Sequence, residues 1–188
     1  MAVIDRQKWD KVYSHPQRKY PNPPAALIAH ADYLIPGSLL DVASGEGAVA
    51  LYMAASGQYP TTAIDISQTG LNRLSQFASE RKIALNTQCL DLDDLQQLST
   101  LGKYQNITLF RYKPSTELLK ALMAALVPGG RLLFSSFNIQ HHQTTGFSRR
   151  FSLDKREFMD IDGTAKLIHF AASSSAPYTD TYIFENPQ

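Results

Sequence analysis

The sequence predicts an α/β protein: one doubly wound domain with a seven-stranded, mostly parallel sheet and helices on both faces. Three observations carry this prediction. From residue 38 onward, short apolar or β-branched segments alternate with helical segments, which is typical of a parallel sheet. A turn of small residues, 43–47, lies between the first strand and its helix. Two late strands with only a turn between them predict a C-terminal antiparallel hairpin.

Composition bounds the function before any motif is considered. The 188 residues suit a single domain, 1–188, and the net charge of +1 supplies no general attraction to nucleic acid. Cys89 is the only cysteine and no Cys/His metal spacing exists, so neither an internal disulfide nor a metal site is expected. No apolar run reaches membrane-spanning length, and the polar N-terminus lacks a signal-peptide core. We therefore expect a soluble, cytoplasmic protein without a metal, a nucleic-acid partner or a membrane.

The first 37 residues predict two short helices around a proline-rich segment. Residues 5–13 have weak helical character, with Trp9 and Tyr13 one turn apart. Residues 15–24 contain several prolines and cannot form a regular helix. A second helix is expected over 25–33, ended by Pro36 and Gly37.

The central segments alternate between strand and helix. Ser67 is a plausible N-cap for a helix through Arg81, and Ser115 for an amphipathic helix through Leu126. Shorter helices are expected over 48–56 and 93–98. The five predicted strands are 38–42, 61–66, 83–90, 107–112 and 131–137.

The C-terminal part differs in character. Residues 138–150 are polar and predict a loop, and residues 154–159 predict a short helix. The last two strands are expected over 165–172 and 181–185.

The turn after the first strand is the strongest functional signal. Its small residues let a ligand lie against the backbone, and the helix that follows offers unpaired N–H groups. Asp41, directly before the turn, favours a ligand that also carries a positive group, such as an amino acid joined to a nucleoside. A dinucleotide is the competing interpretation, because residues 45–50 match G-x-G-x-x-A and Asp65 lies 20 residues beyond Gly45.

Four segments resemble the motifs of class I S-adenosylmethionine-dependent methyltransferases, in the correct order. Residues 41–47, DVASGEG, resemble the D-x-G-x-G-x-G turn, and 63–67, AIDIS, resemble the motif whose acidic residue holds the ribose. Residues 90–92 resemble the adenine-bordering motif, and 126–133, LVPGGRLL, resemble the approach to the fifth strand. A looser likeness to small tellurite-resistance-like methyltransferases rests on Trp9, Tyr13 and the segment 151–153.

Two departures from the family pattern matter. Ala43 replaces the first glycine of the turn, and its methyl group needs a negative φ to sit without strain. The N/D-P-P-Y signature is absent after the fourth strand, where the chain has Phe110, Arg111, Tyr112, Lys113 and Pro114 instead. That absence argues against methylation of exocyclic base amines.

The resemblance implies a Rossmann-like fold and a set of site residues. The methionine part of the cofactor would lie against the turn, Asp65 would take the ribose hydroxyls, Asp91 and Leu92 would border the adenine, and Phe110 would close the pocket near the sulfonium. Each has a structural alternative: turn ordering for Asp41, helix capping for Asp65 and Asp91, and core packing for Phe110. The implied cofactor-binding residues are Asp41, Ala43, Ser44, Gly45, Gly47, Asp65, Ile66, Asp91, Leu92 and Phe110.

The resemblance also implies an N-terminal helical lid (1–35), a cofactor-binding core (36–137), and an acceptor-side loop with the hairpin (138–188). Methyl transfer from a sulfonium needs little acid–base help, so no catalytic residue is assigned. Candidate acceptor contacts are Arg111, Tyr112, Tyr13 and Arg18; His141, His142, Arg149 and Arg150 are weaker candidates.

The predicted function is S-adenosyl-L-methionine-dependent methyl transfer to a small-molecule acceptor, by a monomer or homodimer. A cofactor-binding protein without transfer activity and an NAD-dependent oxidoreductase are the alternatives.

Overall fold

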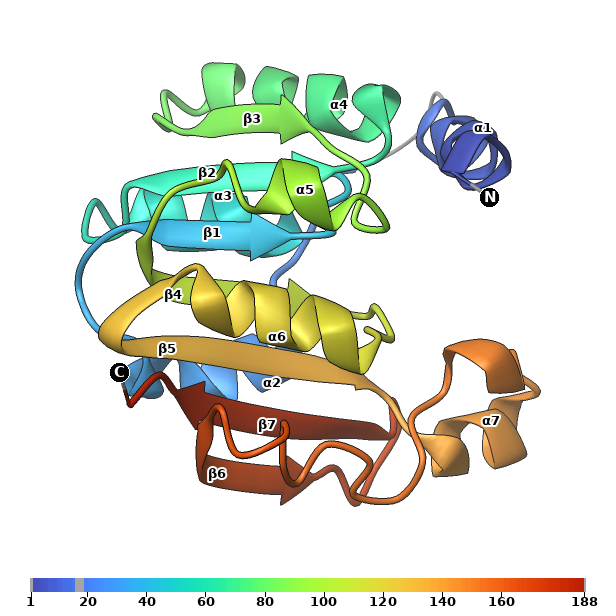
Figure 1. Cartoon of the computed structure of the whole chain (residues 1–188). Coiled ribbons are helices and arrows are strands. Elements are labelled where there is room, and N and C mark those ends of the chain that lie inside the picture. The colour runs from blue at the N-terminus through green and yellow to red at the C-terminus, as the bar shows by residue number, and fades with distance from the viewer. Residues whose placement is uncertain (1, 16–18, 188) are drawn as a thin grey trace.

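Seven strands form one mixed sheet in the computed structural model, which describes residues 2–15 and 19–187 (Figure 1). The strand order is β3-β2-β1-β4-β5-β7-β6. Only β7 runs antiparallel to its neighbours, β5 and β6. The predicted fold class is confirmed. The strands are β1 (Leu39–Val42), β2 (Thr61–Asp65), β3 (Asn86–Cys89), β4 (Tyr104–Phe110), β5 (Leu126–Phe137), β6 (Lys166–Ala172) and β7 (Thr179–Glu185).

Helices cover both faces of the sheet, and each face has its own core. In Figure 1, α5 and α6 lie in front of the sheet and α2 and α3 behind it. Side chains of α6 pack on β1, β4 and β5 in the larger core, whereas those of α2 and α3 pack on the opposite face. The helices are α1 (Ala2–Tyr13), α2 (Ala25–His30), α3 (Ala48–Ala55), α4 (Gln68–Glu80), α5 (Leu95–Leu98), α6 (Thr116–Ala124), α7 (Ile139–Thr145), and the 3-10 turns η1 (Ala31–Tyr33) and η2 (Arg149–Phe151).

Local sequence signals fix the two long helices of the central part. The Ser67 hydroxyl accepts the Gly70 N–H at 3.1 Å, and the Ser115 hydroxyl accepts the Leu118 N–H at 3.1 Å. Both serines therefore satisfy an otherwise unpaired N–H of the first helical turn. The two predicted caps are confirmed.

The part of the chain after β5 differs from the prediction. Residues 139–145, predicted as loop, form α7 because the Asn138 side chain accepts the N–H groups of Gln140 and His141 at 3.1 and 3.2 Å. The helix predicted over 154–159 is wrong. There the Asp154 N–H is bound by the Glu157 carboxylate, and the backbone forms turns. β3 is also shorter than predicted, since it is an edge strand and begins only at Asn86.

The carboxyl ends of the parallel strands meet at one edge of the sheet, at the right in Figure 1. Both α1 and the segment with α7 and η2 lie beyond this edge. The strand order reverses between β1 and β4, which is where ligands of doubly wound sheets bind.

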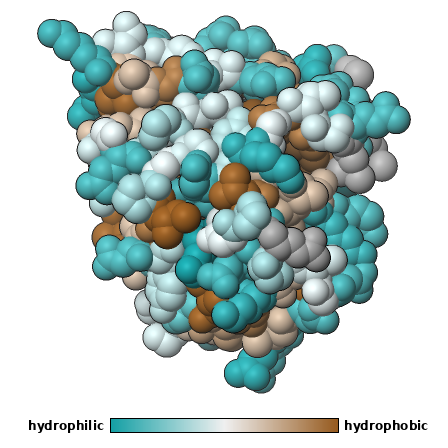
Figure 2. All heavy atoms as spheres, turned by 60° about the vertical axis from the view of Figure 1, so that its left-hand side comes forward, coloured by the Kyte–Doolittle hydropathy of each residue, from teal (hydrophilic) through white to brown (hydrophobic). Residues whose placement is uncertain are grey.

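The opposite, amino-terminal edge has a different surface. Its hydrophobic side chains stand in small separate groups among hydrophilic ones (Figure 2). A cavity of about 590 Å³ lies there, lined by residues of η1, of the end of α3 and of the segment before β2. It is remote from the glycine-rich turn, so we do not place the ligand site in it. No described helix is long and apolar enough to cross a membrane.

Candidate functional site

The turn after β1 alternates left-handed residues. Ala43, Gly45 and Gly47 have φ values of 54°, 54° and 84°. Ala43 has a positive φ and is therefore strained. A left-handed conformation costs an alanine about 1 kcal/mol or more. The turn keeps the shape that glycines would give it, at the expense of some stability.

Gly45 and Gly47 are required for space as well as for φ. A Cβ on Gly47 would collide with the buried Leu74 side chain of α4. A Cβ on Gly45 would collide with the Tyr13 hydroxyl of α1. The N-terminal helix therefore lies directly over the turn, at the place where the methyltransferase resemblance puts the methionine part of the cofactor.

Asp41 orders the turn. One carboxylate oxygen accepts the Ala50 N–H of α3 at 3.1 Å, and the other accepts the Thr108 hydroxyl of β4 at 2.9 Å. The side chain is buried, and burial raises the pKa of Asp41 to about 7, against the lowering effect of these two hydrogen bonds. Asp41 therefore ties β1, α3 and β4 together, which is the structural alternative considered for it.

Asp65 links β2 to the turn. Its two oxygens accept the N–H groups of Gly45 and Ser67, each at 2.8 Å. Burial raises the pKa of Asp65, and the hydrogen bonds oppose that shift. The Ile66 N–H also interacts with this carboxylate. A carboxylate has about four acceptor sites, so Asp65 retains capacity for a ligand hydroxyl.

Ser44 supplies an unsatisfied polar atom in this turn. Its N–H donates to the Ile64 carbonyl at 3.0 Å, but its buried hydroxyl has no hydrogen-bond partner. An orphaned buried hydroxyl costs free energy until a ligand or water pairs with it. The orphaned Ser44 hydroxyl and the remaining acceptor sites of Asp65 thus fit a ligand that carries both hydrogen-bond acceptors and hydroxyl donors.

The acidic residues after β3 make different hydrogen bonds, and only Asp94 caps the helix that follows. Asp91 accepts the Asp93 N–H at 3.0 Å, and Asp94 caps α5 through the N–H groups of Gln96 and Gln97. Leu92 is buried in the larger core, while Ile66, after β2, is half-buried and accepts a hydrogen bond from Cys89. Asp91 is half-buried at the edge where the adenine is predicted.

The residues at the end of β4 point to different places. Phe110 packs in the core with Val49 and Met53 of α3. Arg111 is exposed, has φ 56°, and donates its N–H to the Ser135 carbonyl. Tyr112 packs against the larger core, and burial raises its pKa to about 12, with Asp93, Asp91, Asp5 and Asp65 contributing. Tyr112 is therefore near the carboxylates of the predicted cofactor side.

Asp10 is a positioning residue that the sequence did not reveal. Its carboxylate accepts the Ser67 hydroxyl at 2.5 Å and the Thr69 N–H at 3.1 Å. These bonds lower the pKa of Asp10 and hold α1 against the start of α4, and so place Tyr13 over the turn. A lone acid in a weakly helical segment carries no sequence signal for this role.

Side-chain contacts, both local and between distant residues, hold the segment after β5. The Lys113 ammonium donates to the Ser152 carbonyl and to the Glu157 carboxylate, both at 2.9 Å. Arg149 pairs with Asp154 at 2.5 Å, and His141 stacks on Phe137 with 4.4 Å between ring centroids. His142 faces elsewhere, toward the Phe147 carbonyl. Arg18 lies outside the described residues.

Among the residues that the structure describes, no group of three or more His, Cys, Asp or Glu side chains is placed to hold a metal ion.

A family model described as "Methyltransferase domain" matches residues 39–130. This part of the chain, slightly less than half of it, is therefore similar to a methyltransferase domain. It comprises β1 to the start of β5, with the turn, Asp65 and the segment after β3. The position of β7, antiparallel between β5 and β6, differs from the parallel 3-2-1-4-5-6 order of dinucleotide-binding sheets and argues against the NAD interpretation.

A curated relative is the ubiquinone biosynthesis O-methyltransferase of Idiomarina loihiensis, 29% identical over 112 residues, which are 58% of this chain and 46% of the relative. The chain thus matches less than half the length of this relative.

Two solved structures share the fold across almost the whole chain. The N-methyltransferase NodS from Bradyrhizobium japonicum, in complex with S-adenosylhomocysteine, is 17% identical with a TM-score of 0.69, covering 97% of this chain and 98% of NodS. The [4+2]-cyclase SpnF is 13% identical with a TM-score of 0.75, covering 100% of this chain and 96% of SpnF. At these identities the likeness concerns the fold of the methyltransferase domain and not its reaction.

Proposed function

We propose that the protein is an S-adenosyl-L-methionine-dependent methyltransferase that acts on a small-molecule acceptor. The observation that carries the proposal is the geometry of Asp65. Its carboxylate is held beside the turn by the N–H groups of Gly45 and Ser67, and its four acceptor sites are not all used, so it can accept a ribose hydroxyl. The methyltransferase family match and the NodS complex with S-adenosylhomocysteine support the same cofactor.

The residues of the turn would hold the cofactor. Ser44 would offer its unpaired hydroxyl, Gly45 lets Tyr13 approach the turn closely, and Asp65 would orient the ribose. Asp91 and Leu92 would border the adenine, and Phe110 and Val49 would back the pocket from the core. The bound cofactor supplies an already activated methyl group. The protein's task is then to align an acceptor atom in line with it and to exclude water.

The proposal keeps the functional division that the resemblance implies. Residues 1–35 would cover the site, 36–137 would bind the cofactor, and 138–188 would contact the acceptor. Within the first segment, Tyr13 over Gly45 is the covering contact, and Asp10 fixes it. A soluble cytoplasmic enzyme, as a monomer or homodimer without a nucleic-acid partner, is part of this proposal.

Calorimetric titration with S-adenosylhomocysteine tests the cofactor. Asp65→Asn removes the negative charge from the proposed ribose contacts, so we expect a loss of affinity on the order of a hundredfold. Asp94→Asn is the matched control, because Asp94 only caps α5, and its affinity should equal that of the wild type. Folded wild-type protein that gives no heat at millimolar S-adenosylhomocysteine would refute the proposal.

A cofactor-binding protein without methyl transfer is the second candidate. The [4+2]-cyclase SpnF shares the fold, and Ala43 strains the turn without removing it. Incubation of the protein with S-adenosylmethionine and a panel of phenols, amines, thiols and carboxylates distinguishes the two. Formation of S-adenosylhomocysteine above the acceptor-free rate supports the enzyme. Tight cofactor binding without formation of that product supports the second candidate.

A further inference from the structure

Two segments that are distant in sequence meet beyond the carboxyl edge of the sheet. The Lys8 ammonium of α1 lies 5.1 Å from the ring centroid of Phe151 in η2 and 5.2 Å from that of Trp9. The start of α4 holds α1 through Asp10, and the Leu153 N–H holds the end of η2 against the Phe137 carbonyl of β5 at 2.8 Å. The contact of Lys8 with Phe151 therefore connects a helix held beside β2 to a segment held beside β5. It spans the carboxyl ends of β1 and β4, which lie between them.

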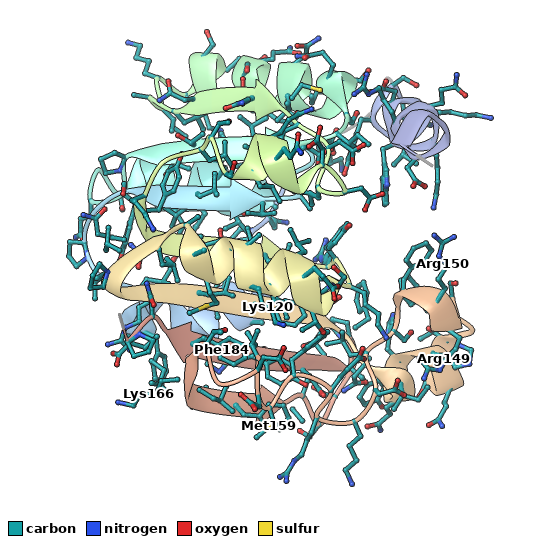
Figure 3. The ribbon with its side chains drawn as sticks, viewed as in Figure 1. Lys120, Arg149, Arg150, Met159, Lys166 and Phe184 are labelled. Carbon is teal, nitrogen blue, oxygen red and sulfur yellow. The ribbon has the colours of Figure 1, made fainter. Side chains whose placement is uncertain are left out.

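A second cation lies on the same ring. The Arg150 guanidinium is 5.3 Å from the Phe151 centroid. Figure 3 places Arg150 on the part of η2 nearer to α1 and Arg149 nearer to α7. We call Lys8, Trp9, Arg150 and Phe151 the arch. Its two rings are each 39% exposed.

The two cations of the arch have no carboxylate partner in the part of the chain that the structure describes. Among the described residues, Lys8 and Arg150 make no ion pair, whereas the neighbouring cations Arg149 and Lys113 are paired with Asp154 and Glu157. Two cations against one aromatic ring repel each other, and an anion beside the ring relieves that repulsion.

Several carboxylates of this edge lie where the cofactor is proposed. Asp65 ends β2, Asp91 and Asp93 follow β3, and together with Asp5 of α1 they help to raise the pKa of Tyr112. These carboxylates suit the proposed cationic sulfonium, whereas the cations of the arch suit an anion. Arg111, exposed at the end of β4, adds a third cation at the point where the strand order reverses.

We propose that the methyl acceptor is a small organic anion with a planar apolar body, bound at the arch. This inference rests on the proposed function and specifies its substrate class. The carboxylate or phosphate of the acceptor pairs with Lys8 and Arg150, and its apolar body lies against Trp9 and Phe151. Binding an anion from both segments also joins α1 to η2, and so closes the site against water.

Trp9 gives a direct signal because it is the only tryptophan of the chain. Protein saturated with S-adenosylhomocysteine is titrated with benzoate, phenyl phosphate and the neutral isostere benzamide, while tryptophan fluorescence is recorded. We expect both anions to change the fluorescence saturably and benzamide to have no effect. A stronger response to phenyl phosphate than to benzoate would favour a phosphorylated acceptor, and the reverse a carboxylate.

Charge-neutralising variants locate the effect. Lys8→Gln and Arg150→Gln should each weaken anion binding by roughly threefold to tenfold, and the double variant should abolish it. Lys11→Gln in α1 and Lys155→Gln after η2 are exposed controls with the same change of charge, and they should bind anions like the wild type.

The two proposals fail in different ways. Wild-type protein that does not bind S-adenosylhomocysteine refutes the proposed function, and the acceptor class with it. Normal S-adenosylhomocysteine binding with equal responses to benzamide and benzoate, or with equal losses in the control variants, refutes the acceptor class alone. Once an acceptor is found, Lys8→Gln should raise its KM and leave kcat unchanged.

Discussion

The proposed cofactor side and the proposed acceptor side of this molecule are built by different means. On the cofactor side, the backbone itself is constrained: left-handed residues at 43, 45 and 47, and buried carboxylates that bind backbone N–H groups. On the acceptor side, exposed segments are joined by side-chain contacts, such as Lys113 to Glu157 and Lys8 to Phe151. A constrained backbone requires particular residue types at particular positions, and these appear in the sequence as motifs. Many residue pairs can make an equivalent side-chain contact, so such contacts produce no motif. We therefore expect substitutions on the cofactor side to cost more stability.

The largest effect is expected at Gly47. An alanine there combines a left-handed φ of 84° with a collision against the fully buried Leu74, so the free energy of unfolding should fall by about 3 kcal/mol. Urea denaturation measures this loss of stability. Gly57→Ala is the matched control, since its φ is 72° but nothing lies near the added Cβ; its loss should be only about 1 kcal/mol. Equal losses would mean that the collision is unimportant.

Asp41 should make stability depend on pH. Because its pKa rises from 3.8 in the unfolded chain to about 7 in the folded one, the folded state binds the proton more tightly. Its ionisation therefore costs stability progressively as the pH rises between these values, and the full cost is present above the folded pKa.

Asp41→Asn removes that cost. The free energy of unfolding of the variant minus that of the wild type should be larger at about pH 8 than at about pH 5, by roughly 2–3 kcal/mol. Urea denaturation of both proteins at both pH values gives the difference, in which other titrating groups cancel. A pH-independent difference would show that Asp41 titrates normally.

Ala43→Gly should stabilise the protein. Glycine adopts a φ of 54° without a steric penalty, although it adds entropy to the unfolded chain, so we expect a net gain of about 1 kcal/mol. Thermal denaturation measures this gain, and calorimetry with S-adenosylhomocysteine should show equal or tighter binding. Ala55→Gly, in the last turn of α3, is the control and should lose stability. A loss at both positions would show that Ala43 is unstrained.

The smallest effect on stability is expected on the acceptor side. Lys113→Met removes a half-buried ion pair and the bond to the Ser152 carbonyl, so stability should fall by about 1 kcal/mol. S-adenosylhomocysteine affinity should be unchanged, while benzoate binding at the arch should weaken because η2 is no longer held. Lys155→Met is the control. A large loss of cofactor affinity would overturn the division into two differently built sides.

The sequence by itself determined the alternation of strands and helices up to residue 137, the caps at Ser67 and Ser115, and the turn with Asp41, Gly45, Gly47 and Asp65. Each of these signals is local: a hydroxyl at a helix start, a glycine where φ is positive, an acid at a strand end. Hydrogen bonds and steric limits within a few residues decide such features, so they can be predicted without knowledge of the fold.

Only the tertiary structure decided where those residues point and what meets beyond the sheet. It turned Asp41 toward Ala50 and Thr108, placed Tyr13 over Gly45 through Asp10, and brought Lys8 to Phe151. It also made 139–145 a helix, because Asp180 of β7 holds the capping Asn138 at 2.8 Å. These contacts join residues more than forty positions apart in several cases, and the energy of a pair at that separation depends on the folded arrangement rather than on either residue's neighbours in sequence.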